Sequence, residues 1–385
     1  RSQCFVVALV SQETHVREAA AQWMEATRRL LLAIASAEME WQGADCDPPE
    51  DDTPVGPGSM SLPPMAPQAP AASTGPGDAP KGALLAADAM PVARPGAGGK
   101  AGGPGFKLFG PAESNAEYRE KVEGCLGSIR LGESYELCLT THVRSPAGWH
   151  VDPLEMYRKL RGSNPAPYAA LLRCGSGLAV CSSSPERFLR IGRDGVVQSR
   201  PIKGTRRRGG CVEEDESIKA ELAQSEKDRA ENLMIVDLVR NDLGRVCRTG
   251  SVHCPVVMQV ESYATVHQLV SAVEGTLRGE CSAVDCIRAS FPMGSMTGAP
   301  KRRSMQLLEN LEDAARGIYS GSIGFLSVNG SADLSVAIRT AVVTETGVSI
   351  GAGGAITMLS DPQEEWEEML LKSNAVVASA VATAS

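Results

Sequence analysis

One stretch of biased composition decides how much of this 385-residue chain can fold into a packed structure. Residues 43–105 are mainly proline, glycine, alanine, aspartate and serine, with almost no aromatic or β-branched side chains. Such a segment cannot bury enough apolar surface to offset the entropy lost on ordering. We therefore expect a disordered insertion between a short first segment, residues 1–42, and a main domain, residues 106–385. With 43% hydrophobic residues, the chain can bury a sizeable core.

Local patterns predict helices on both sides of this insertion and strands after it. Apolar residues recur at helical spacing over residues 14–41, and residues 217–243 also have a helical pattern. Ser114 and Glu117 form a capping box that opens a further helix, and Asp152 with Pro153 opens another. Alternating or β-rich runs predict strands at residues 135–143, 168–174, 178–191, 195–200, 321–328, 334–343 and 347–351.

Charge and cysteine content exclude several classes of function. The formal net charge is -8, from 46 acidic and 38 basic residues, and no lysine-rich block stands apart, so we expect no nucleic-acid partner. The eleven cysteines form no CxxC pair, which favours free thiols in a reducing compartment. No apolar stretch approaches the roughly 18 residues that a membrane span needs, so we expect no membrane partner.

Two acidic pairs stand three residues apart on expected helices. Asp228 and Glu231 share one helical face, and Glu365 and Glu368 share another, with Lys372 one turn later. If the two helices face each other, their carboxylates supply the oxygen ligands that Mg²⁺ prefers. Each pair alone also fits a solvated helix face stabilised by the helix dipole.

A lysine in a turn offers a second kind of chemistry. Lys203 lies between Ile202 and Gly204, directly after an expected strand and ahead of three arginines. The segment is either an exposed basic hairpin tip or the seat of a nucleophile. In the second case burial and the arginines lower the pKa of Lys203, so that a neutral amine is available.

Two glycine-rich segments, at residues 294–301 and 351–355, are interpreted as loops whose backbone NH groups can approach an anion. The first is followed by an expected helix, whose N-terminus favours negative charge.

Together and in this order, these motifs resemble the chorismate-utilising family that includes anthranilate synthase component I and aminodeoxychorismate synthase component I. The resemblance runs almost continuously from Phe106 to the C-terminus. Its further motifs are Ser182-Ser183-Ser184-Pro185-Glu186-Arg187-Phe188, Asp237-Leu238-Val239-Arg240-Asn241-Asp242, Tyr319-Ser320-Gly321-Ser322-Ile323-Gly324 and Ala337-Ile338-Arg339-Thr340.

The resemblance implies an α+β fold with two orthogonally packed antiparallel sheets flanked by helices. Residues 1–42 resemble a remnant of the family's N-terminal half, so we expect that half to be truncated. The implied ligands of Mg²⁺ are Glu231 and Glu368, supported by Asp228 and Glu365. The implied substrate-binding residues are Gly204, Thr205, Thr297, Tyr319, Arg339, Gly353, Gly354, Ala355 and Lys372.

Within this family, the residue at position 203 separates the branches. Alanine is usual there in anthranilate synthases, whereas lysine is found in many aminodeoxychorismate synthases. The lysine branch implies that Lys203 attacks C2 of chorismate, with Glu186 as the acid/base, before ammonia attacks C4. A weaker cue is Gln268, which stands where anthranilate synthases usually have histidine; here the histidine is His267.

The resemblance also implies a source of ammonia, namely a glutamine amidotransferase as a subunit or a fused domain. A chloroplast location is expected if the source is a photosynthetic eukaryote, and a cytoplasmic one otherwise. The alternatives are anthranilate synthase component I, an isochorismate or salicylate synthase, or a non-catalytic binding chain.

Overall fold

The computed structural model describes residues 108–175, 177–263 and 266–383, all within one compact unit of the chain. The helix expected at residues 14–41 and the insertion expected at residues 43–105 lie outside the described residues.

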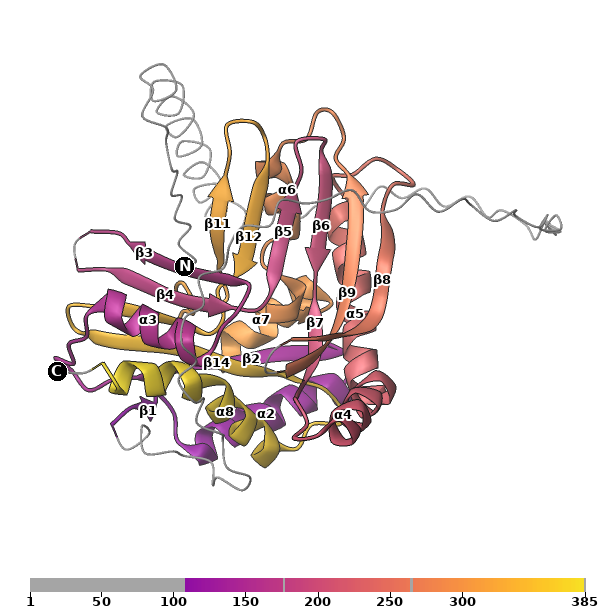
Figure 1. Cartoon of the computed structure of the whole chain (residues 1–385). Coiled ribbons are helices and arrows are strands. Elements are labelled where there is room, and N and C mark those ends of the chain that lie inside the picture. Colours follow the sequence, from indigo (N-terminus) through magenta and orange to yellow (C-terminus); the bar gives the residue numbers. More distant parts are fainter. Residues whose placement is uncertain (1–107, 176, 264–265, 384–385) are drawn as a thin grey trace, which may run out of the picture. The chain divides into compact units, whose positions relative to one another are not determined.

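Two antiparallel sheets carry the described part of the chain, and their strands run crosswise to each other (Figure 1). In the first sheet the order is β1 (Gly110–Pro111), β2 (Glu136–Arg144), β14 (Gly347–Ile356), β13 (Thr340–Thr344), β4 (Ala179–Ser184) and β3 (Tyr168–Arg173), and β10 (Gly298–Ala299) also pairs with β2. The expected α+β class with two crossed sheets is confirmed.

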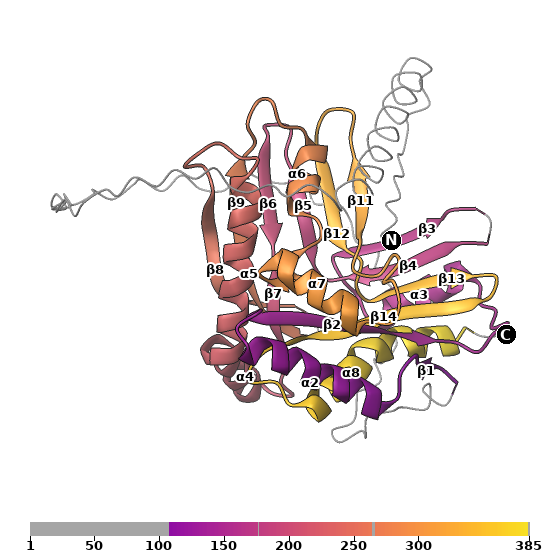
Figure 2. The same cartoon turned by 180° about the vertical axis from the view of Figure 1, so that it is seen from behind.

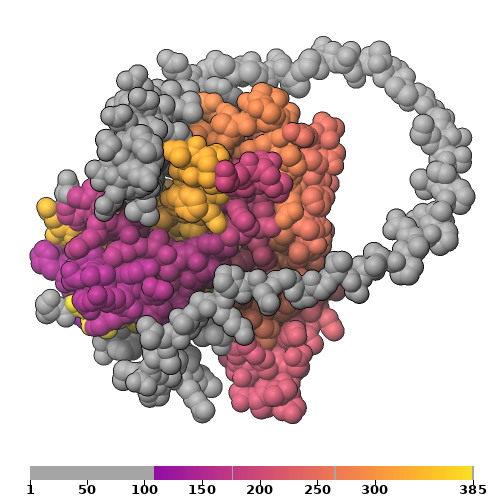
Figure 3. Space-filling view, turned by 45° about the horizontal axis from the view of Figure 1, so that its top comes forward, coloured from indigo at the N-terminus to yellow at the C-terminus, as the bar shows by residue number. Residues whose placement is uncertain are grey.

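In the second sheet the order is β11 (Ser322–Leu326), β12 (Ala332–Val336), β5 (Arg187–Ile191), β6 (Val196–Arg200), β9 (Val266–Thr276) and β7 (Ile202–Arg207), and β8 (His253–Ser262) also pairs with β9. Strand β9 holds this sheet together, because β6 and β7 pair with one of its edges and β8 with the other. The tips of the β11–β12 and β5–β6 hairpins lie side by side on the face shown in Figure 3.

Helices flank both sheets. Their bounds are α2 (Asn115–Arg130), α3 (Pro153–Ser163), α4 (Val212–Gln224), α5 (Glu226–Gly244), α6 (Ala283–Ser290), η3 (Gly294–Met296), α7 (Lys301–Leu311) and α8 (Pro362–Val381). Helix α8 packs on β14 and contacts α2 and α3, whereas α5 packs on β9 beside α6 (Figures 1 and 2). The capping box of Ser114 and Glu117 is present at the start of α2, as predicted.

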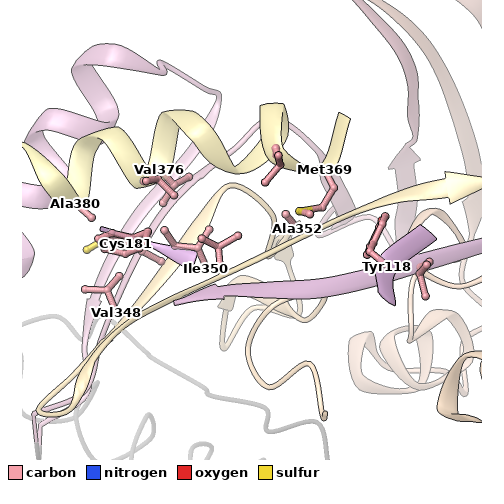
Figure 4. Packing of buried hydrophobic residues seen from close by; sticks show 14 of the residues in the cluster. Tyr118, Cys181, Val348, Ile350, Ala352, Met369, Val376 and Ala380 are labelled. Atoms are coloured by element: carbon pink, nitrogen blue, oxygen red, sulfur yellow. The ribbon is translucent and has the colours of Figure 1, made fainter. Parts of the chain in front are cut away.

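Burial of apolar side chains between α8 and the first sheet fixes the position of α8. Met369, Val376 and Ala380 of this helix face Ile350 and Ala352 of β14, and all five are buried (Figure 4). Each fully buried aliphatic side chain contributes about 1.5–3 kcal/mol to this packing. The same helix carries Glu365 and Glu368, so the core also determines where these carboxylates lie.

Two runs that the sequence presents as single strands each cross from one sheet to the other. Residues 178–191 divide into β4 and β5, and residues 334–343 divide into β12 and β13. The first crossing contains Glu186 and the second contains Arg339. Backbone hydrogen bonds join the crossings to neighbouring strands: Val336 N donates to Glu186 O at 3.1 Å, and Ser183 N donates to Arg339 O at 3.1 Å. The prediction of single strands is wrong here, and the crossings place both side chains where the sheets meet.

The helical pattern over residues 217–243 also divides. Helix α4 ends at Gln224, and Ser225 begins α5 as an N-cap whose hydroxyl accepts from Asp228 N at 3.3 Å. The β8–β9 hairpin lies between Leu243 and Asp285, where the sequence analysis assigned no element.

Candidate active site

A bulge in β7 accompanies the burial of Lys203. The register between β7 and β9 shifts between Ile202 and Thr205, and Gly204 inside this shift has a φ of +83°. Glycine adopts such a φ without the steric penalty that a Cβ imposes. The Lys203 side chain is only 9% exposed, whereas Thr205 is exposed. The exposed-hairpin interpretation is therefore wrong for Lys203.

The Lys203 amine lies between two carboxylates. Its Nζ donates to Glu136 Oε1 at 2.6 Å and lies 3.9 Å from Glu231 Oε2. Burial lowers the pKa of Lys203, but the carboxylates raise it by more, so the net shift is upward. The predicted lowering of this pKa is wrong, because the arginines at positions 206–208 pair with other acids and the neighbours of the amine are two glutamates.

Glu136 is a part of this site that the sequence analysis missed. The alternation over residues 135–143 predicts that Tyr135 and Leu137 lie on the buried face of the strand. Tyr135 is instead 69% exposed, and Glu136 is 0% exposed. Its second oxygen, Oε2, has no hydrogen-bond partner among the described residues. A glutamate inside an apolar strand was the available signal, since a glutamate is almost never fully buried unless it is paired.

Glu186 adds a group that can exchange protons near neutral pH. Burial raises the pKa of its carboxyl to about 7, although a hydrogen bond from Ser295 and the charge of Lys203 act in the opposite direction. Lys203 and Glu186 therefore share one electrostatic environment. Glu186 also lines a small cavity with Phe188 and Ile235.

The acidic pair of α5 is buried, so the interpretation of this face as a solvated surface is wrong. Asp228 accepts from Arg206 Nη2 at 2.9 Å, and Glu231 lies beside Lys203. Burial raises the pKa of Glu231 to about 7, against the lowering charge of Lys203. Gly204 lies close to this helix, because a Cβ at that position would be 2.8 Å from Asp228 Cγ.

The acidic pair of α8 has different partners. Glu365 is buried, accepts from Ser360 Oγ at 2.6 Å and lies 3.8 Å from Lys227 Nζ, a residue of α5. Glu368 forms a 2.5 Å ion pair with Lys372. Burial raises the pKa of Glu365. The Glu368 side chain is 46% exposed, so it is covered only in part. This partial burial raises the pKa of Glu368, but the charge and hydrogen bond of Lys372 outweigh it and the net shift is downward.

These acids have the donor chemistry of a magnesium site but are not gathered around one point. Among the described residues, no group of three or more acidic, histidine or cysteine side chains is close enough to hold a metal ion. The charge of Lys203 nevertheless acts to lower the pKa of both Glu231 of α5 and Glu368 of α8, so both carboxylates are within electrostatic reach of the same amine. Carboxylate oxygens are the ligands that Mg²⁺ prefers, so the residues fit the ion chemically, and its binding stays a proposal.

Tyr319 packs against strand β14, and Arg339 contacts helix α8. A Cβ added to Gly351 would overlap the Tyr319 ring, so the absence of a side chain lets the ring lie flat against the strand. Arg339, with a φ of +51°, donates from Nη1 to Lys372 O at 2.8 Å. Burial raises the pKa of the Tyr319 phenol, which keeps it a hydrogen-bond donor. A phenol and a buried guanidinium can together bind a carboxylate.

Residues 351–355 belong to strand β14 and do not form the predicted loop. Gly353, Gly354 and Ala355 pair with β2 on one edge, while β13 pairs only with Gly347–Ile350 in the described part of the chain. The far edge of these three residues is where the proposed backbone contacts to substrate would be made.

Thr297 and Lys372 hold backbone groups near this strand. Thr297 Oγ1 donates to Met293 O at 3.0 Å, and its carbonyl accepts from Cys138 N at 2.9 Å, which ties the turn to β2. Lys372 Nζ donates to Gly353 O at 3.1 Å.

His267 is buried on the opposite face of β9 from Gln268 and forms a hydrogen bond with Asp215 of α4.

A buried lysine, several acids and a guanidinium thus make up a candidate site in an α+β fold of two crossed sheets. The chain belongs to the family of chorismate binding enzymes, whose family model matches residues 79–378. It is 56% identical over 268 residues to "Aminodeoxychorismate synthase, chloroplastic" of Arabidopsis thaliana, covering 69% of this chain and 29% of that protein. It is 57% identical over 261 residues to the aminodeoxychorismate synthase of Streptomyces pristinaespiralis, covering 68% and 36%.

Among solved structures, anthranilate synthase component I from Streptococcus pneumoniae TIGR4 matches with a TM-score of 0.64 and 33% identity, over 70% of this chain and 59% of that one. The chain spans about a third of the length of the two aminodeoxychorismate synthases that it matches. No helix in the described residues has the length and apolar character to cross a membrane.

Proposed function

We propose that this chain is the chorismate-aminating part of an aminodeoxychorismate synthase, which replaces the C4 hydroxyl of chorismate by an amino group for 4-aminobenzoate and folate synthesis. The observation that carries the proposal is the buried Lys203 amine, 2.6 Å from Glu136 and in the same electrostatic environment as Glu186. The names of the two relatives support this branch of the family.

The first half of the reaction uses Lys203 as the nucleophile. Its ammonium must lose a proton before it can attack, and Glu136 Oε1 is the nearest acceptor. Nζ then forms a bond to C2, the two ring double bonds shift, and the C4–O bond breaks. Glu186 gives a proton to the departing hydroxyl, which leaves as water; its pKa of about 7 suits this step.

The second half reverses the shift. Ammonia attacks C4, the double bonds return, and the C2–N bond to Lys203 breaks, which releases the amine. Glu136 then returns its proton to this amine, so that the ammonium is restored. Glu186, now a carboxylate, accepts a proton from the incoming nitrogen. Each group thus ends in the protonation state in which it began.

Chorismate carries two carboxylates, and the site offers a different cation for each. Glu231 and Glu368, with Asp228 and Glu365 in support, would hold Mg²⁺, whose charge would stabilise the ring carboxylate. Arg339 with Tyr319 is the proposed partner of the other carboxylate. Gly204, Thr205, Thr297, Lys372 and the backbone of residues 353–355 complete the proposed substrate site.

Ammonia is the remaining reactant. We assign its supply to a glutamine amidotransferase, as a partner subunit or as a domain fused to the same protein. Because the Arabidopsis relative is named chloroplastic, a chloroplast is the proposed location.

Product identification tests this function. The full-length protein is incubated with chorismate, ammonium and Mg²⁺, and products are separated by mass. Aminodeoxychorismate supports the proposal. Anthranilate with pyruvate would assign the chain to the branch of its Streptococcus pneumoniae structural relative, isochorismate or salicylate to the remaining enzymes, and binding of chorismate without any product to a non-catalytic chain.

A further inference from the structure

Lys227 is a cation that the proposed mechanism does not use. It lies in the first turn of α5, and its Nζ reaches across to α8, 3.8 Å from Glu365 Oε1. Its positive charge lowers the pKa of Glu231, Glu365 and Glu368 alike. One ammonium therefore acts on three carboxylates that come from two different helices.

The attachment of Lys227 is looser than that of the other cations in this region. Lys203 and Lys372 make ion pairs of 2.6 and 2.5 Å with Glu136 and Glu368. The contact of Lys227 is 3.8 Å, which is beyond hydrogen-bond length, and its side chain is 41% exposed. A lysine with a flexible four-carbon stem and partial exposure can leave its partner for solvent at little cost.

We propose that Lys227 is a built-in counter-cation of Glu231, Glu365 and Glu368 and that a divalent cation displaces it on binding. The proposal rests on the magnesium site of the proposed function. The carboxylates of α5 and α8 repel one another, although Lys203 lies beside Glu231 and Lys372 pairs with Glu368. The ammonium of Lys227 offsets this repulsion, but it also opposes an incoming Mg²⁺. Lys227 therefore lowers the affinity for the ion and favours a site that fills only when the ion is abundant.

Calorimetric titration of the full-length protein with MgCl₂ tests the first part. Lys227→Met keeps the aliphatic stem and removes the charge, whereas Lys227→Arg keeps the charge. Lys219→Met is the matched control, since Lys219 is 39% exposed and contacts Glu216 at 3.5 Å on α4. Lys227→Met should bind Mg²⁺ about three- to tenfold more tightly, the effect of one unit charge removed beside a partly solvated ion. Lys227→Arg and Lys219→Met should stay within twofold of the wild type.

Equal or weaker binding by Lys227→Met, in a wild-type background that does bind Mg²⁺, overturns this inference and leaves the proposed function intact. If neither protein binds Mg²⁺, both the magnesium site and the inference fail. Binding of Mg²⁺ by Lys227→Met but not by the wild type would support the inference, because the charge of Lys227 would then oppose the ion strongly enough to prevent its binding.

Amine labelling tests displacement directly. Lysines are acetylated under limiting reagent with and without Mg²⁺, and each site is quantified by mass spectrometry with Lys219 as the internal reference. Mg²⁺ should raise labelling of Lys227 at least twofold while that of Lys219 stays constant. Unchanged labelling at saturating Mg²⁺ would show that the ammonium stays in place, which contradicts displacement.

Discussion

Replacing Glu136 by glutamine removes one charge from the buried pair with Lys203 and keeps the shape of the side chain. The two side chains are 0% and 9% exposed, and their atoms are 2.6 Å apart. Breaking such a pair from one side costs about 3–5 kcal/mol, because the other charge stays buried without compensation. Since Glu231 remains 3.9 Å from the amine, we expect a loss near the low end, about 3 kcal/mol in the free energy of unfolding at pH 7.

The loss should also depend on pH in a defined direction. In the wild type the folded-state pKa of Lys203 lies above its ordinary value of 10.5, so the contribution of the pair does not fall as pH rises from 7 to 10.5. In Glu136→Gln, burial of the Lys203 amine lowers its pKa and the charge of Glu231 raises it. Burial is the larger of these two effects, so we expect the net shift to be downward. The folded variant then loses the Lys203 proton at a lower pH than the unfolded variant does. The difference in free energy of unfolding between wild type and variant therefore shrinks as pH rises from 7 toward 10, by at most about 1.4 kcal/mol per pH unit.

Urea unfolding at several pH values and constant ionic strength measures both effects. Glu216→Gln, which removes the acid of the exposed Lys219 pair on α4, is the control and should change stability by at most about 0.5 kcal/mol. The double variant Glu136→Gln/Lys203→Met should recover much of the loss, because neither member of the pair then leaves the other as a buried charge without its partner. A deficit below about 1 kcal/mol, or one that grows with pH, would refute this account of the pair.

Three further predictions concern the same site. Gly204→Ala should lower the free energy of unfolding by at least about 1 kcal/mol more than Gly250→Ala, the usual cost of overpacking. Both glycines have positive φ, but only the Cβ at 204 would meet a neighbour, 2.8 Å away on Asp228. Equal costs in urea unfolding would mean that α5 yields easily. Glu231→Gln should abolish amination with an unchanged circular dichroism spectrum, and full turnover of the wild type in EDTA would contradict the magnesium requirement. Chorismate with Mg²⁺ and no ammonia should leave a covalent adduct on Lys203 in intact-mass spectra, and Lys203→Ala should lose it; wild-type rates in that variant would remove the lysine from the mechanism.

Features that depend on a few neighbouring residues follow from the sequence alone. The capping box of α2 and the Asp152 N-cap of α3 are present as predicted, because their donors and acceptors lie within three residues of one another. The i,i+3 spacing of the acids on α5 and α8 likewise fixes which face each pair shares.

Where the chain crosses between sheets was decided only by the tertiary structure. Residues 178–191 are β-rich with one local break, Pro185, which cannot donate to a strand ladder. A proline alone does not show that the chain changes sheet at Glu186. Each half takes its place because of the strands it pairs with, β13 for β4 and β12 for β5, which lie about 150 positions further along the sequence. Register and partner depend on the packing of whole faces, which no short window contains.

The electrostatics of Lys203 were likewise settled by distant residues. Its neighbours in sequence are arginines, and they predict a lowered pKa. Its neighbour in space is Glu136, 67 positions away, and the fold brings the two together by pairing β2 and β7 with different sheets that meet at the site. Coulomb energy depends on separation and burial, so the sequence could name the lysine, but only the structure could show which charge it faces.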